Sequence, residues 1–194
     1  MTMPGNWQLS WHDIIFLVIT VMWWAEFRIF SSQKNSEEGG RESFRYILAA
    51  ILSIILLTII LTFFDLGAVG AENRFIFKSV GLITYGTGLI LRYWCSYLLG
   101  RYFSRSINVE EDQNLVSRGP YRFLRHPLYL GLFLLTASVP LYMGNVLVVL
   151  FAIMLLFLVL QKRIEEEEEI LENRLGERYR EWKKDRYRLI PFLY

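Results

Sequence analysis

The sequence is poor in the residues that crosslink a chain or bind metal ions, with one cysteine and two histidines among its 194 residues. The single Cys95 excludes an intrachain disulfide, and its place in an apolar run predicts a buried packing role. His12 and His126 lie in distant segments without a set of further ligands, so we predict no bound metal. No basic residue precedes the first apolar run, which argues against a cleavable signal segment.

Apolar residues are abundant instead: 54% of the chain is hydrophobic and 16% is aromatic. This exceeds what the core of a soluble domain needs and indicates an integral membrane protein. A hydrocarbon core about 30 Å thick is crossed by roughly 20 mostly apolar helical residues. The chain is predicted to be all-α with five transmembrane helices, at residues 11–30, 46–64, 79–99, 127–142 and 145–160. Only residues 143–144 separate the last two, which predicts a tight helical hairpin.

Lysine and arginine are distributed unevenly among the connections. Residues 28–45, residues 101–125 and the chain after Leu160 hold four, five and nine of them, eighteen in all, whereas the alternate connections hold two. By the positive-inside rule, the amino terminus is predicted outside and the carboxyl terminus in the cytoplasm.

The fifth segment is predicted to continue as a helix past the membrane, because helix-favouring residues extend to Leu175, before Gly176 offers a terminator. A helix of about thirty residues is about 45 Å long, which exceeds the bilayer. Its last turns therefore stand in the cytoplasm. The aromatic and basic residues that follow are typical of a surface helix at the lipid headgroups.

Two polar clusters bracket the predicted hairpin. The first is the run RHPLYLG at residues 125–131, where Pro127 disfavours helical geometry for His126 and predicts a helix N-cap there. The free backbone N–H groups at such an end favour an anion, such as a carboxylate. Tyr129 shares the face of His126.

The second cluster begins at Arg163 and continues through five consecutive glutamates, residues 165–169. A run of glutamates is also typical of a solvent-exposed helix face. Adjacent carboxylates repel one another, however, so the run is not there to stabilise the helix. Arg163 and Glu167 are four residues apart and project on one side. The hairpin returns the chain to the side it left, so both are predicted to approach the first cluster. Arg92, inside the third segment, is costly in lipid and is expected to face protein, water or this site.

The ordered motifs LVSRGPY at 115–121, RHPLYLG at 125–131, and Arg163 with Glu167 resemble the isoprenylcysteine carboxyl methyltransferase family. The resemblance covers roughly residues 80–194. The same superfamily includes phospholipid N-methyltransferases and, more remotely, sterol reductases of similar membrane architecture. It implies a two-helix transmembrane region at residues 1–78 and a catalytic region at residues 79–194, which includes a cytoplasmic loop, 100–126. Cytoplasmic helices after the last span would close a cofactor pocket.

The resemblance implies methyl transfer from S-adenosyl-L-methionine, which becomes S-adenosyl-L-homocysteine, to the carboxylate of a C-terminal isoprenylated cysteine. The substrate would reach a cytoplasmic site from the lipid, with membrane lipids as the surroundings and no nucleic-acid partner. Arg163 would hold the substrate carboxylate, and Glu167 would act in catalysis and in cofactor binding. The remaining cofactor-binding residues implied are Gln113, Asn114, Leu115, Val116, Tyr121, His126, Pro127, Leu128 and Tyr129.

The residue types suit this chemistry. A carboxylate acceptor is already ionised near neutral pH and needs no general base, and an arginine can fix it with two hydrogen bonds. N-methylation of a phospholipid amine such as ethanolamine is the nearest alternative, and it would require Glu167 or Glu168 as a base. A sterol-type reductase and a non-enzymatic membrane scaffold or channel remain as further alternatives.

Overall fold

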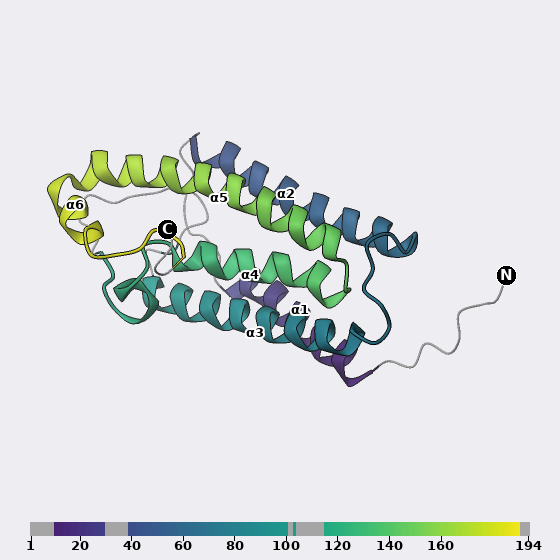
Figure 1. Cartoon of the computed structure of the whole chain (residues 1–194). Coiled ribbons are helices and arrows are strands. Elements are labelled where there is room, and N and C mark those ends of the chain that lie inside the picture. The colour runs from purple at the N-terminus through teal and green to yellow at the C-terminus, as the bar shows by residue number, and fades with distance from the viewer. Residues whose placement is uncertain (1–9, 30–38, 101–102, 104–114, 191–194) are drawn as a thin grey trace.

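The computed structural model describes residues 10–29, 39–100, 103 and 115–190 (Figure 1). Within these ranges the regular structure is helical, and the only β-type pairings are two isolated bridges. The elements are α1 (Trp11–Ile29), α2 (Gly39–Phe63), α3 (Arg74–Leu99), the short 3-10 helix η2 (Gly119–Arg122), α4 (Pro127–Tyr142), α5 (Val146–Leu175) and α6 (Glu177–Lys183). The predicted all-α class is confirmed for this part of the chain.

The helix bounds follow the apolar runs except at two amino-terminal ends. α4 has the predicted bounds, whereas α2 and α3 begin several residues before the predicted starts at 46 and 79. The first turns of α2 are polar and contribute nothing to hydropathy, and the added first turn of α3 is apolar but flanked by Arg74 and Lys78. Asn145 caps α5, because its side chain accepts a hydrogen bond from the Val148 backbone N–H.

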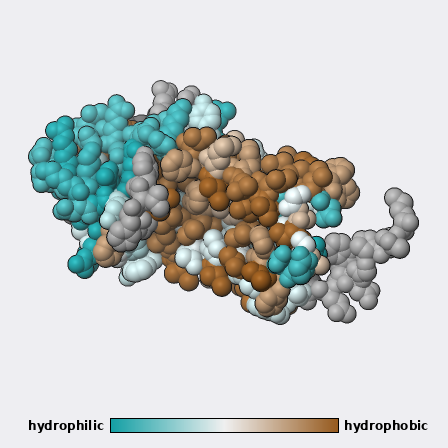
Figure 2. All heavy atoms as spheres, viewed as in Figure 1, coloured by the Kyte–Doolittle hydropathy of each residue, from teal (hydrophilic) through white to brown (hydrophobic). Residues whose placement is uncertain are grey.

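Among the residues that the structure describes, three helical segments are long and apolar enough to cross a membrane: Ser43–Phe63 in α2, Arg74–Leu99 and Val146–Leu175. Figure 2 shows a broad apolar band around the middle of the molecule and a polar cap at the end formed by α6 and the end of α5. Large apolar side chains such as Trp24 and Phe63 are 75% and 82% exposed. Because contiguous apolar surface of this kind is unfavourable in water, it faces lipid, and the protein is an integral membrane protein.

α3 and α4 pack closely because glycines remove the side chains between them. A Cβ atom on Gly88 would lie 2.9 Å from the Gly131 carbonyl oxygen, and one on Gly131 would lie 2.6 Å from Cγ of Arg92. A Cβ on Gly81 would meet the Tyr142 backbone at 2.7 Å. Gly81 and Gly88 thus permit the close approach of α3 and α4, whereas a Cβ on Gly86 would have its nearest neighbour at 4.0 Å.

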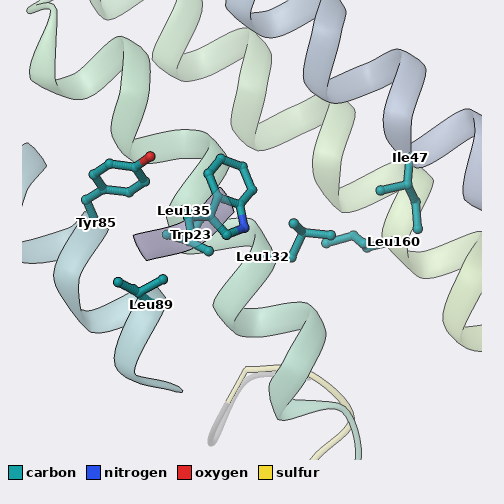
Figure 3. Packing of buried hydrophobic residues seen from close by; sticks show 7 residues of the cluster. All are labelled: Trp23, Ile47, Tyr85, Leu89, Leu132, Leu135 and Leu160. Carbon is teal, nitrogen blue, oxygen red and sulfur yellow. The ribbon is translucent and has the colours of Figure 1, made fainter. Parts of the chain in front are cut away.

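One buried cluster joins all five long helices (Figure 3). Its members are Trp23 from α1, Ile47 from α2, Tyr85 and Leu89 from α3, Leu132 and Leu135 from α4, and Leu160 from α5. Leu132 and Leu160 lie one helical turn from Tyr129 and Arg163, respectively. The apolar core therefore sets the positions of the two polar clusters relative to each other.

α1 is tied to the bundle by ion pairs near both of its ends. Arg92 of α3 donates to the fully buried Glu26 from Nε, at 2.8 Å, and from Nη2, at 2.5 Å. Lys78 Nζ lies 2.8 Å from the Asp13 carboxylate. The expectation that Arg92 faces protein is confirmed, and its partner Glu26 was missed at the sequence level.

α5 is a single helix of 30 residues that extends past the apolar band, as predicted. It ends at Gly176, which has a positive φ of 55° and donates its backbone N–H to the Glu172 carbonyl. α6 follows and folds back against α5. Tyr179 on α6 is fully buried against Leu171 and Leu175, so it is a packing residue rather than a headgroup anchor.

Candidate active site

The amino-terminal end of α4 forms one side of the site. His126 is the N-cap residue and Pro127 occupies the first turn, as predicted. The segment after α6 runs beside this end: the backbone N–H groups of Arg125 and His126 donate to the carbonyl oxygens of Tyr187 and Arg188, at 2.8 and 3.2 Å. The carboxyl-terminal segment thereby fixes where α4 begins.

α5 supplies the facing side. The Tyr129 hydroxyl donates to the Glu167 carboxylate at 2.5 Å and accepts from Arg163 Nε at 3.1 Å. His126 Nδ1 lies 3.9 Å from the same carboxylate. The two polar clusters, 38 residues apart between Tyr129 and Glu167, therefore meet where α4 packs against α5.

Glu168 joins α5 to the start of α4 and to the segment after α6. Its carboxylate accepts from Arg125 Nη1 and pairs with His126 Nε2, both at 3.1 Å, and lies 3.3 Å from Arg188 Nε. Glu168 is buried, unlike Glu165 and Glu169. A signal for this role was present in the sequence, because Glu168 falls on the apolar stripe Leu160, Ile164, Leu171 and Leu175, at helical spacing.

Arg163 is almost completely buried although it carries a charge, with 3% of its surface exposed. Besides Tyr129, it contacts Ser43 of α2, whose hydroxyl accepts a hydrogen bond from Nη1. Ser43 was not singled out in the sequence, because the first two helices contain no motif that resembles the family.

Two buried tyrosines, Tyr121 and Tyr179, lie beside this cluster. Burial, the Cys95 thiol and the Glu167 carboxylate raise the pKa of Tyr121 well above its ordinary value. Burial and the carboxylates of Glu168 and Glu167 also raise the pKa of Tyr179. Both phenols are therefore neutral near physiological pH. The Tyr179 hydroxyl has no hydrogen-bond partner among the residues that the structure describes.

The predicted site residues fall into three groups. Tyr121, His126, Pro127, Leu128, Tyr129, Arg163 and Glu167 lie at or beside the junction of α4 and α5. Leu115 packs beside Tyr179, while the half-buried Val116 has no contact that assigns it to the cluster. Gln113 and Asn114 lie outside the described residues. Among the described residues, no group of three or more His, Cys, Asp or Glu side chains is arranged to hold a metal ion.

Comparisons with known proteins place this arrangement in a family. The isoprenylcysteine carboxyl methyltransferase (ICMT) family profile matches residues 81–173. Protein-S-isoprenylcysteine O-methyltransferase A of Arabidopsis thaliana is 32% identical over 152 residues, which cover 76% of this chain and 74% of the relative. The Xenopus laevis protein-S-isoprenylcysteine O-methyltransferase is 30% identical over 78% of this chain, and the chain spans about half, 52%, of that relative.

The fold is also similar to a solved structure, that of the eukaryotic intramembrane Ras methyltransferase ICMT. The TM-score is 0.65, with 20% sequence identity, and the match covers 93% of this chain and 64% of that one. At this identity the similarity concerns the fold, and the family assignment rests on the sequence relatives. The chain belongs to the isoprenylcysteine carboxyl methyltransferase family.

Proposed function

We propose that the protein transfers a methyl group from S-adenosyl-L-methionine to the carboxylate of a C-terminal isoprenylated cysteine. The observation that carries this proposal is the buried Arg163 guanidinium, which lies beside the Tyr129–Glu167 hydrogen bond. A buried, planar guanidinium suits a carboxylate acceptor, which it can orient with paired hydrogen bonds. An amine acceptor would carry a positive charge of its own and would be repelled there.

The described residues fit the cofactor. The unpartnered phenol of Tyr179 and the carboxylate of Glu167 offer a hydrogen-bond donor and an acceptor to its polar groups. The rings of Tyr121 and Tyr129 could place electron-rich faces near a sulfonium. When bound, the cofactor would supply an electrophilic methyl group. His126, Pro127, Leu128 and Leu115 would complete the pocket, with Gln113, Asn114 and Val116 assigned to it by resemblance.

The chain's own residues would act mainly by positioning. Arg163 would hold the acceptor carboxylate, which is ionised near neutral pH and requires no proton transfer. The Tyr129 hydroxyl hydrogen-bonds both Arg163 and Glu167. One side chain therefore links the residue that would hold the acceptor to the residue that would hold the cofactor. Burial of the cluster excludes water from the reacting groups.

The isoprenyl chain would approach Arg163 along an open groove between α2 and α5. The groove has a volume of about 410 Å³ and reaches from Ser43 and Lys162 at its polar end to Ser53 and Leu155 in the apolar band. Its walls are mostly apolar, which suits a hydrocarbon chain that stays in lipid while its carboxylate reaches Arg163. Membrane lipids would cover the remaining outer surface.

The same proposal includes the membrane arrangement. α1 and α4 would span together with α2, α3 and α5, with α4 and α5 forming the helical hairpin. The excess of lysine and arginine on alternate connections supports an outer amino terminus and a cytoplasmic carboxyl terminus. The active site would then open to the cytoplasm, from which the cofactor arrives.

The choice of acceptor is testable with purified protein in lipid nanodiscs and methyl-labelled cofactor. Farnesylated or geranylgeranylated cysteine analogues are expected to receive label that mild base releases, as it does from a methyl ester. The corresponding carboxamides should receive none, because they offer no carboxylate to Arg163. Label recovered in a phospholipid amine and absent from both prenylated analogues would contradict the proposal in favour of N-methylation.

A further inference from the structure

α2 lies outside the residues that match the family profile, 81–173, yet it contributes a polar side chain to the candidate active site. Ser43 is 3% exposed, and its hydroxyl accepts a hydrogen bond from Arg163 Nη1 across 120 residues of sequence. A buried hydroxyl is costly unless it is hydrogen-bonded. This contact therefore offsets the cost of burying Ser43.

The packing of α2 determines where this hydroxyl lies. Ser43, Ile47, Ala50 and Ile54 follow one another at helical spacing and are all buried. Ile47 belongs to the same core cluster as Leu160 of α5, one turn before Arg163. Ser43 thus forms the polar end of an otherwise apolar stripe, directly opposite the guanidinium.

The two hydrogen bonds reach Arg163 from different helices. Tyr129 of α4 accepts from Nε, and Ser43 of α2 accepts from Nη1. Because the guanidinium is planar, contacts at two of its nitrogens fix both its direction and the rotation of its plane. Ser43 also lines the polar end of the groove between α2 and α5, where an acceptor from the lipid would meet Arg163.

We propose that Ser43 is a positioning residue that orients the Arg163 guanidinium toward an acceptor carboxylate entering from the α2–α5 groove. The inference rests on the proposed function and extends it, since it assigns a helix outside the family match to acceptor recognition. Within the described part of the chain, the hydrogen bond of Ser43 is to Arg163 and not to a cofactor residue or to Glu168. Its effect should therefore appear in acceptor affinity and leave cofactor affinity unchanged.

The test compares Ser43→Ala with Thr58→Val in steady-state methyl transfer to a farnesylated cysteine analogue. Each variant removes one buried hydroxyl from α2, but Thr58 donates only to the Ile54 carbonyl of its own helix. Ser43→Ala is expected to raise KM for the acceptor about tenfold, the effect of losing one hydrogen bond to a charged group. Thr58→Val should leave this KM unchanged, and Ser43→Thr, which retains the hydroxyl, should recover most of the loss.

Binding of S-adenosyl-L-homocysteine provides the second readout, and it also reports folding. Equal affinity in wild type and Ser43→Ala, together with the raised KM, would support a positioning role. An unchanged KM in Ser43→Ala, or a matching loss of cofactor affinity, would overturn this inference while the proposed function stands. A wild-type protein that methylates no prenylated cysteine would overturn the proposed function, and this inference with it.

Discussion

Replacement of Arg163 with glutamine is expected to lower kcat/KM for a farnesylated cysteine acceptor at least about a hundredfold. Loss of the guanidinium leaves the acceptor carboxylate to be buried without its charge partner, and such losses cost several kcal/mol. Arg163→Lys should be only partly active, because an ammonium retains the charge but not the planar pair of donors. Initial rates over a range of acceptor concentrations measure both effects.

The Arg163 variants need a control for charge and one for folding. Arg178→Gln removes an exposed positive charge on α6 and should leave kcat/KM unchanged. S-adenosyl-L-homocysteine should still bind to Arg163→Gln, because Glu167, His126 and Tyr179 remain in place. Activity of Arg163→Gln above about a third of wild type would show that the guanidinium does not hold the acceptor.

Replacement of Glu26 with alanine should be the most destabilising single change at a charged residue, with an expected loss of about 3–5 kcal/mol. Glu26 is fully buried, and its removal leaves the Arg92 guanidinium in an apolar bundle without its carboxylate partner. Arg92 also supports α4: its Nη1 lies 3.5 Å from the Leu128 carbonyl oxygen, and its stem packs against Gly131. Thermal unfolding in a mild detergent, followed by tryptophan fluorescence, measures the change.

The double variant Glu26→Met/Arg92→Met distinguishes two possible causes of the stability loss in Glu26→Ala, an unpaired buried charge and lost packing. Replacing both charges with apolar side chains removes the unpaired group, so much of the lost stability should return. Glu181→Ala, which breaks an exposed pair with Lys184, should leave the melting temperature unchanged. If the double variant were no more stable than Glu26→Ala, the unpaired charge would not be the cause of the loss.

The membrane helices were predictable because their apolar runs are a local property of the sequence. The bounds of α4 were predicted to the residue, since Pro127 marks its start and Gly144 and Asn145 interrupt the apolar sequence just after its end. The start of α2 was not, because its first turns are polar and contribute nothing to hydropathy. The approach of Arg163 to His126 followed from chain reversal alone, although the roles of both residues depend on the family resemblance.

Non-local partners were the part that sequence reasoning could not find. Glu26 meets Arg92 across 66 residues, and Ser43 meets Arg163 across 120. Ser43 is an ordinary residue in its own segment. Glu26, like Arg92, is a charged residue inside an apolar span and is expected to be paired, but only helix packing identifies the partner. Glu168 is different, because its position on the apolar stripe of α5 marks it as a carboxylate that must be buried and therefore paired.

The measurement that tests the site most directly is calorimetric binding of S-adenosyl-L-homocysteine to the purified protein. Wild type is expected to bind it at one site per chain, and binding should be lost in Glu167→Ala and His126→Ala. Glu169→Ala, which removes an exposed carboxylate from the same run, should bind as wild type does. Unchanged affinity in the Glu167 and His126 variants, or no binding to wild type, would contradict a cofactor site at the junction of α4 and α5.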